Sequence, residues 1–439
     1  MPFGLRLRSP HDREIAALAL PALGTLIAEP LYVLADTAVV GHLGTDELAG
    51  LALASTVLLT FHALLIFLAY ATTSQVARLI GAGHPDRAAH RSVQALWLAL
   101  ALGVAGMVLL IPAGQPLLRL LGGEGAVLDA GTTYLKISLL GLPFMLVLLA
   151  ASGSFHGRQN TRIPLALALA GAVANLVIEL VLIYGFGYGI GASALATLIA
   201  QVSTSAVGTF LVLRWARVQG AGLRADPAEM TDLLVVGSAL MVRTAALRGS
   251  FTLSVALAGR MGTVELASHQ IALQVWGLLA LALDSIAIAG QSITGRWLGA
   301  GDGERARAVA RRMIELAVAV GAGLGILTVA ARNPLANLFT DDPLVVAATA
   351  SVMLMVAVHQ PIGGLVFALD GILIGAGDHV YLAKAMVLSA LAFAATAIAL
   401  FAASFGLIWL WVAIGVLLVT RAVTLTLRWR TATWLRLGA

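Results

Sequence analysis

The stretch Gly41–Gly50, GHLGTDELAG, returns 218 positions later as Gly259–Ser268, GRMGTVELAS, with six of ten residues identical. The same offset relates Arg78–Ala89, RLIGAGHPDRAA, to Arg296–Arg307, RWLGAGDGERAR, with six of twelve identical. Further pairs that keep the offset without a gap are Pro116 with Pro334, Pro143 with Pro361, Gly157 with Gly375, and Asn160 with Asp378. The chain is therefore built from two copies of one unit.

The composition of the repeated unit points to a membrane. Hydrophobic residues make up 60% of the chain and charged residues 11%, and the mean hydropathy is +0.95. A soluble protein of this length needs much more polar surface. The apolar runs reach about 20 residues, enough to cross a bilayer as helices, and they lack the alternation of barrel strands. We predict an all-α polytopic membrane protein.

Twelve apolar spans are expected, six in each repeat. An even number returns the chain to its starting side, so the two six-helix lobes should be parallel duplicates around a central cavity, related by a pseudo-twofold axis along the membrane normal. The predicted spans are 14–40, 48–76, 91–112, 131–152, 164–184, 191–213, 232–258, 266–294, 308–330, 344–368, 380–402 and 408–428.

The longest connection joins the two repeats. Residues 214–231, RWARVQGAGLRADPAEMT, have the glycine, proline and charge content of a linker. We therefore predict an amino-terminal lobe over residues 1–213, a cytoplasmic linker over 214–231, and a carboxy-terminal lobe over 232–439.

Basic residues give the orientation. With these spans, 21 arginines and lysines fall on one side, Arg6, Arg8 and Arg421 among them, and four on the other. Arg243 and Arg248 lie inside the seventh span and are not counted. The positive-inside rule then places both termini in the cytoplasm of a protein of the inner or plasma membrane.

Several kinds of chemistry lack support in the sequence. The chain has no cysteine, which excludes disulfides and thiol catalysis. It has no phosphate-binding loop, and its histidines lack a metal-ligand spacing. We therefore expect no enzyme, no cofactor, no metal site and no nucleic-acid partner. Any active transport should be driven by an ion gradient, with a proton or sodium as the coupling ion.

Intramembrane carboxylates are the strongest functional signal, because burying a charge is costly. Asp36 lies about five residues before the outer end of the first span, and Glu179 lies at a similar depth in the fifth. Asn175 precedes Glu179 by four positions and shares its helix face. The repeat places Ser254 and Ala397 at the acidic positions. We interpret Asp36, Glu179 and Asn175 as an ion-coupling site in one lobe; a structural role for the two acids is the alternative.

Other intramembrane charges have a structural interpretation first. Glu29 lies two helical turns from Asp36 and is either a second proton stop or a hydrogen-bond partner. Arg243 and Asp284 require partners, and we predict that they pair with each other for stability. Asp370 is interpreted as an acid that anchors a cytoplasmic loop.

Five segments resemble the multidrug and toxic compound extrusion (MATE) family, in its DinF-like branch, and the resemblance covers nearly the whole chain. It implies an antiporter that exports amphipathic or cationic compounds in exchange for protons or sodium. The segments are LALPALGTLIAEPLYVLADTAVVGHLGTDELAG (18–50), QVARLIGAGHPDRA (75–88), ANLVIELVLIYGFGYGIGASALAT (174–197), ALDSIAIAGQSITGRWLGAGD (282–302) and LDGILIGAGD (369–378).

The resemblance also implies roles for single residues. In DinF-like proteins a polar network joins the first, fourth, fifth and sixth helices, and its tyrosine and threonine correspond to Tyr134 and Thr197. Pro21 resembles a first-helix proline linked to bending, although a static kink is equally compatible with it. Glu179 departs from the family pattern, where an aspartate stands, so the carboxylate has a longer arm.

These observations favour alternating access by two lobes, with a small-molecule substrate, a lipid bilayer environment and a monomeric state. The first alternative is a lipid-linked precursor flippase of the same superfamily, for which a strongly cationic central cavity is expected. The second is a membrane scaffold or receptor that does not transport.

Overall fold

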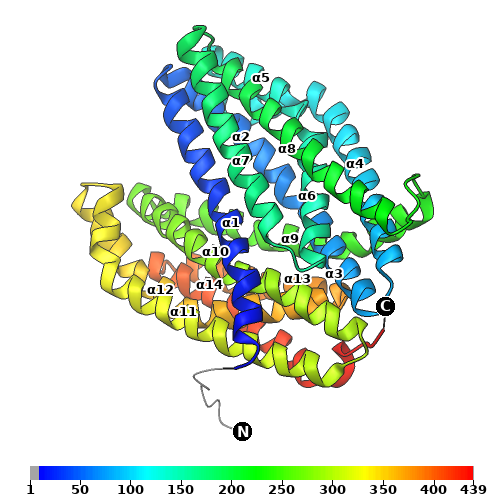
Figure 1. The fold of residues 1–439 in the computed structure, drawn as a ribbon. Coiled ribbons are helices and arrows are strands. Elements are labelled where there is room, and N and C mark those ends of the chain that lie inside the picture. The colour runs from blue at the N-terminus through cyan, green and yellow to red at the C-terminus, as the bar shows by residue number, and fades with distance from the viewer. Residues whose placement is uncertain (1–8, 439) are drawn as a thin grey trace. The chain divides into compact units, whose positions relative to one another are not determined.

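The computed structural model describes residues 9–438, so Arg6 and Arg8 lie outside the described residues. Within this range every regular element is helical (Figure 1). The elements are α1 (Asp12–Gly41), α2 (Thr45–Leu65), α3 (Phe67–Gly81), α4 (Pro85–Leu120), α5 (Gly125–Leu139), α6 (Leu142–Gly157), α7 (Arg162–Leu180), the π-helix η1 (Val181–Gly185), α8 (Ile190–Val218), α9 (Pro227–Met261), α10 (Thr263–Gly299), α11 (Gly303–Phe339), α12 (Pro343–Gly375), α13 (His379–Ala402), α14 (Leu407–Arg430) and the 3-10 helix η2 (Ala432–Trp434).

The helices agree with the twelve predicted spans. In the described part of the chain, eleven helical segments are long and apolar enough to cross a membrane. The pair α5 and α6, bent by 50°, completes twelve when counted as one span. Pro143 stands in the first turn of α6, where its missing N–H costs no intrahelical bond. Its counterpart Pro361 lies inside the unbroken α12.

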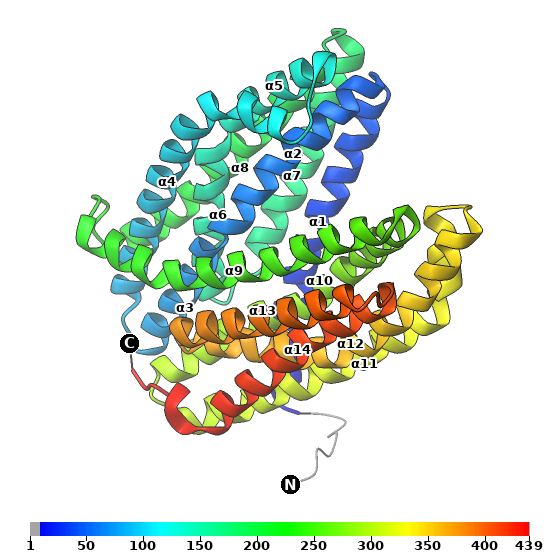
Figure 2. The ribbon, with the colours of Figure 1, turned by 180° about the vertical axis from the view of Figure 1, so that it is seen from behind.

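The described residues pack as two compact units. The amino-terminal unit is 24–237, and the carboxy-terminal unit combines 9–23 with 238–438. Both boundaries therefore fall inside a helix, α1 in one case and α9 in the other. In the amino-terminal unit α4 packs on α6, α2 on α5 and α7 on α8. In the carboxy-terminal unit α12 packs on α10 and α11, and α13 on α14 (Figures 1 and 2).

The repeated prolines and glycines mark close helix contacts. A Cβ added to Gly103 of α4 would lie 2.4 Å from Cα of Pro143 in α6. A Cβ added to Gly321 of α11 would lie 2.3 Å from the carbonyl oxygen of Gln360 and 3.1 Å from Cα of Pro361 in α12. These glycines stand 218 positions apart, as the prolines do. The repeat therefore preserves a contact that admits no side chain.

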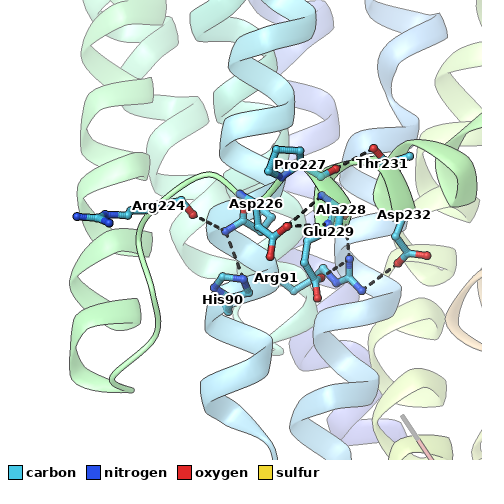
Figure 3. A network of polar contacts seen from close by, with 10 residues as sticks. His90, Arg91, Arg224, Asp226, Pro227, Ala228, Glu229, Thr231 and Asp232 are labelled. Carbon is cyan, nitrogen blue, oxygen red and sulfur yellow. Dashed lines mark hydrogen bonds and ion pairs between the residues drawn. The ribbon is translucent and has the colours of Figure 1, made fainter.

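The connection between the repeats is mostly helical. The segment outside α8 and α9 covers only residues 219–226, because both helices extend beyond the predicted spans. Arg91 of α4 forms ion pairs with Glu229 (2.6 Å) and Asp232 (2.9 Å) of α9 (Figure 3). Gln94 of α4 contacts the segment that precedes α9. Its side chain donates to the carbonyl oxygen of Arg224 and accepts from the amide of Asp226. The predicted linker is thus held against α4 at many points.

Candidate functional site

The predicted polar residues of the amino-terminal unit come together between four helices. Asp36 lies in α1, Tyr134 in α5, Asn175 and Glu179 in α7, and Thr197 in α8. Asp36 is 5% exposed, Asn175 2% and Glu179 0%. A group of polar side chains this well buried in apolar helices requires internal partners.

Asp36 receives two hydroxyl donors. Tyr134 donates to Oδ2 at 3.3 Å, and Ser193 of α8 makes a short hydrogen bond to Oδ1. Hydrogen bonds to a carboxylate are stronger than those between neutral groups. Asp36 is therefore tied to the fourth and sixth spans from its position near the outer end of the first.

A second group of hydrogen bonds centres on Thr197. Tyr32 of α1 lies 2.7 Å from the hydroxyl oxygen of Thr197, and Asn175 donates to that oxygen at 3.0 Å. Asn175 also reaches the Tyr32 hydroxyl at 3.5 Å. The first, fifth and sixth spans are thus joined by three neutral side chains directly beside the acids.

Glu179 differs from Asp36 in its partners. Neither of its carboxyl oxygens has a hydrogen-bond partner in the described part of the chain, although both are buried. The group interacts electrostatically with Asp36. Two carboxylates that share a buried site cannot both be ionised cheaply. A proton on one of them removes this repulsion and supplies a donor, so the pair is suited to bind and release a proton.

A small apolar cluster adjoins the site on the side that we predict to be the outer one. Val39, Ile183 and Ala192 form a small buried cluster, each one to four positions beyond a polar site residue toward the outer end of its span. Ile183 belongs to η1, the π-helical turn that directly follows Glu179. Such turns are frequent at functional sites because they shift the side chains that follow.

Two residues of the network, Tyr32 and Ser193, are not among the predicted site residues, and one predicted residue, Glu29, lies outside the network. Tyr32 lies four positions before Asp36, and Ser193 four before Thr197, so helical spacing from predicted residues is a signal that points to both. Glu29, in contrast, is exposed, and no hydrogen bond joins it to the network among the described residues. Pro21 lies within α1, which continues as helix through it.

The carboxy-terminal unit contains a buried ionic cluster. Arg243 of α9 pairs with Asp370 of α12 at 2.5 Å, and Arg421 of α14 binds the same carboxylate oxygen, Oδ2. The salt bridge of Arg243 thus goes to Asp370, and the predicted partner Asp284 acts on this pair through its charge. Asp370 is 4% exposed and joins three helices, which corrects the interpretation of it as a loop anchor.

Arg421 also lies elsewhere than expected. It counts toward the cytoplasmic basic residues in the sequence, but it is 4% exposed and inside the helix packing. The cluster has two arginines for two acids, and the same helices in the other repeat carry Thr25, Ser203 and Ser152 at the positions of Arg243, Arg421 and Asp370. Buried charge is therefore distributed differently in the two repeats.

No group of three or more metal-ligating side chains occurs in the described residues. A bilayer-length helix bundle with a buried, partly unsatisfied pair of acids defines a multi-pass membrane transporter of ions or small molecules. Comparison with known proteins identifies the family.

Residues 21–181 and 239–400 each match the sequence pattern of the MatE family, and the two matches begin 218 residues apart (239 − 21). Protein DETOXIFICATION 44, chloroplastic, of Arabidopsis thaliana is 31% identical over 93% of this chain and 80% of its own. DNA damage-inducible protein F of Escherichia coli K12 is 29% identical over 96% and 94%. A structure described as the outward-facing conformation of a multidrug resistance MATE family transporter of the MOP superfamily superimposes with a TM-score of 0.87, at 22% identity, over 97% and 96%.

The chain belongs to the MatE family, in the branch that resembles DNA damage-inducible protein F. It is accordingly a multi-pass transporter of small molecules and not an enzyme. The resemblance in the sequence is thereby confirmed, and so is the all-helical fold.

Proposed function

We propose that the protein is a proton-coupled antiporter that exports amphipathic or cationic compounds by alternating access. The observation that carries this proposal is the pair of Asp36 and Glu179, which lies beside neutral hydrogen-bonding groups in one repeat only. An antiporter needs a group whose charge differs between the two open states, and buried carboxylates meet this need.

The proposed cycle starts with the acids deprotonated and substrate bound. Protons from outside neutralise the pair, and the hydrogen bonds from Tyr134 and Ser193 to Asp36 weaken because they lose their charged acceptor. Since these bonds tie α1 to α5 and α8, the first span is released to rearrange, with Pro21 as the point of bending. Substrate then leaves, and the protons pass to the cytoplasm from the inward-open state.

Protons are favoured over sodium as the coupling ion by the surroundings of Glu179. Hard cations such as sodium require several oxygen ligands around the ion, whereas Asp36 and Ser193 are the groups that act on Glu179 among the described residues. A proton needs a single acceptor. The neighbouring hydroxyl groups of Tyr134 and Ser193 already use their hydrogens on Asp36.

The lipid-linked precursor flippase is the weaker candidate. It requires unpaired cationic side chains for a pyrophosphate group. Of the two arginines that we place inside the seventh span, Arg243 is paired with Asp370. A monomer in the inner or plasma membrane with cytoplasmic termini remains part of the proposal.

Efflux of a cationic dye from proteoliposomes tests the function. An imposed pH gradient should drive efflux in the wild type, and a sodium gradient at constant pH should not. Asp36→Asn keeps the size of the side chain and removes its charge, so it should abolish the pH-driven efflux. Asp342→Asn, at the exposed start of α12, serves as the control. Full retained efflux in Asp36→Asn would refute the assignment.

A further inference from the structure

The carboxy-terminal unit holds a second buried polar site, which has no charged residue in it. His269 of α10 and Trp411 of α14 are both 0% exposed, and His359 of α12 is 4% exposed. The two imidazole rings lie 5.6 and 6.0 Å from the indole ring, centroid to centroid. Three nitrogen atoms, Nδ1 of each histidine and Nε1 of Trp411, have no hydrogen-bond partner in the described residues. Buried polar atoms are rarely left so.

The hydrogen bonds around Ser254 allow one tautomer of His269 to be assigned. The Ser254 hydroxyl donates to the carbonyl oxygen of Phe251 at 2.7 Å. With this hydrogen used, we assign the 3.0 Å contact with Nε2 of His269 as a donation from the imidazole. Nδ1 of His269 is therefore an unprotonated lone pair, free to accept a proton, while Trp411 Nε1 is a free donor. Water or hydronium can satisfy both kinds of group.

The fold keeps room for His359. A Cβ added to Gly415 of α14 would lie 2.9 Å from Nε2 of His359. The corresponding residue of the other repeat is Thr197, which is part of the Asp36 network. A side chain at position 415 would push the imidazole from its stacked position, 24° from the plane of the Trp411 ring.

The site occupies the place that the acids occupy in the other repeat. The offset of 218 residues relates Ser254 to Asp36 and Trp411 to Ser193. The histidines themselves stand at the positions of Leu51 and Gly141, and His269 contacts the position of Asp36 from another helix. The two repeats thus carry titratable groups around the same point of one scaffold, carboxyl groups in the first and imidazoles in the second. This correspondence argues against two histidines scattered at random through an apolar core.

The ionic cluster of this unit lies at a different depth. Along their helices, Arg243 precedes Ser254 by 11 residues, Asp370 follows His359 by 11, and Arg421 follows Trp411 by ten. At 1.5 Å per residue each separation is about 15–16 Å, and it is about 22 Å from His269 to Asp284. All four lie on the cytoplasmic side of the histidines in the predicted orientation.

The nearer charged groups on α9, α10 and α13 turn away from the rings, and one half-buried arginine lies on α11. On α9, Arg248 and Arg260 are exposed, and on α13 Lys384 is exposed. Glu265 of α10 folds back toward Gly262. On α11 the nearest charge is Arg332, three positions before Leu335, which packs on the core.

The rest of the surroundings are apolar or neutral. The buried hydrophobic residues that pack with Trp411 come from α9, α10, α12, α13 and α14. Ser268 and Gln360, the sequence neighbours of the two histidines, are buried and carry neutral side chains. The two histidines are thus the titratable groups of this core.

We propose that His269 and His359, with Ser254 and Trp411, form a second proton-binding site of the transporter. The proposal rests on the proposed proton-coupled function. A hydronium ion transfers its proton to the Nδ1 lone pair of His269, an N–H bond forms, and a water molecule is left. The imidazolium keeps its donation to Ser254, and a cation on His359 is stabilised by the face of Trp411. Release to the cytoplasm breaks the same N–H bond.

Histidine NMR of the full chain tests proton binding without transport. The chain has nine histidines, and the variants His269→Gln and His359→Gln assign the two resonances. Glutamine can replace the donor at Nε2 but cannot titrate. Between pH 8 and pH 5, at least one of the two resonances should move from the neutral to the imidazolium position. Trp411→Phe, which removes the indole N–H and the larger ring, should lower the pH at which it moves.

Proteoliposomes supply the second readout, the number of protons exchanged per dye molecule. This number should fall in His269→Gln or His359→Gln and stay unchanged in His156→Gln, a buried histidine of α6 in the other repeat. Resonances that stay neutral over the whole range, or an unchanged number of protons, would overturn the proposal. Absence of any pH-driven efflux in the wild type would instead refute the proposed function. The NMR titration would still show whether His269 and His359 bind protons.

Discussion

Asp36 and Glu179 interact with each other, yet among the described residues Asp36 receives two hydrogen bonds and Glu179 receives none. This contrast separates their roles. Asp36 is held by hydroxyl groups from two other helices, whereas Glu179 has no such connection in the described residues. We therefore propose that Glu179 carries the transported proton and that Asp36 connects the helices.

Glu179→Gln tests this division at the residue scale. The amide can donate to Asp36 or Ser193 and cannot ionise, so it mimics the protonated acid. The variant should be as stable as the wild type or more stable, by about 1 kcal/mol. Its pH-driven efflux should fall by about tenfold or more, the scale of a coupling between sites. Thermal melting and dye efflux measure the two effects; wild-type efflux would assign the proton elsewhere.

Asp370→Asn tests the buried cluster. Two arginines lose their shared acceptor charge, and a buried unpaired cation costs about 3–5 kcal/mol. A large fall in melting temperature is therefore expected. Asp342→Asn loses only the charge at an exposed helix start, where it accepts from the amide of Leu344 at 2.8 Å, and should cost at most about 1 kcal/mol. Equal melting of the two variants would contradict this account.

At the scale of helices, the two repeats share a close helix contact but differ in the bend of one span. Gly103 in the first repeat and Gly321 in the second each let a neighbouring helix approach closely. The spans that they contact nevertheless differ, because α5 and α6 are bent by 50° whereas α12 is continuous. Residues Leu140 and Gly141 separate the first pair, and His359 stands in the unbroken helix at the position of Gly141.

Gly321→Ala tests the close contact of α11 with α12. The added methyl group meets backbone atoms, which cannot move aside, so the variant should lose about 1–3 kcal/mol of stability. Gly323, two positions further on the same helix, has nothing within 4 Å of an added Cβ. Gly323→Ala should be neutral or stabilising by up to about 1 kcal/mol. Thermal melting in detergent compares the stability of the two variants. Equal losses of stability would contradict the role of the close contact at Gly321.

At the scale of the whole molecule, the duplication, the helix count and the all-helical class can be predicted from the sequence, because the length of the apolar runs and the fixed offset extend over the whole chain. The sequence also predicts five candidate site residues, namely Asp36, Tyr134, Asn175, Glu179 and Thr197. It does not identify Tyr32 or Ser193, because hydroxyl side chains are common in helices, nor Arg421, because an arginine near a span end resembles a loop residue. The pairing of buried charges depends on which helices pack against each other, and the sequence pattern does not show which helices do so.

The orientation can be tested on the whole chain because it contains no cysteine. His84→Cys, in the exposed turn between α3 and α4, should be cytoplasmic. Tyr188→Cys, exposed between η1 and α8, should face outside. A membrane-impermeant maleimide added to intact cells should label the second variant and reach the first only after permeabilisation. The reverse pattern would invert the predicted topology.

Gly415 carries a record of mutational history. If the ancestral unit had a threonine at this place, as the first repeat now has at Thr197, its Cβ would have displaced an imidazole at position 359 from the present stacked position. The stacked histidine then required the loss of the side chain at 415, either before the histidine or together with it. The two halves therefore diverged through substitutions in a particular order. Restoring threonine at position 415 alone would now disturb His359 and would not recover the ancestral structure.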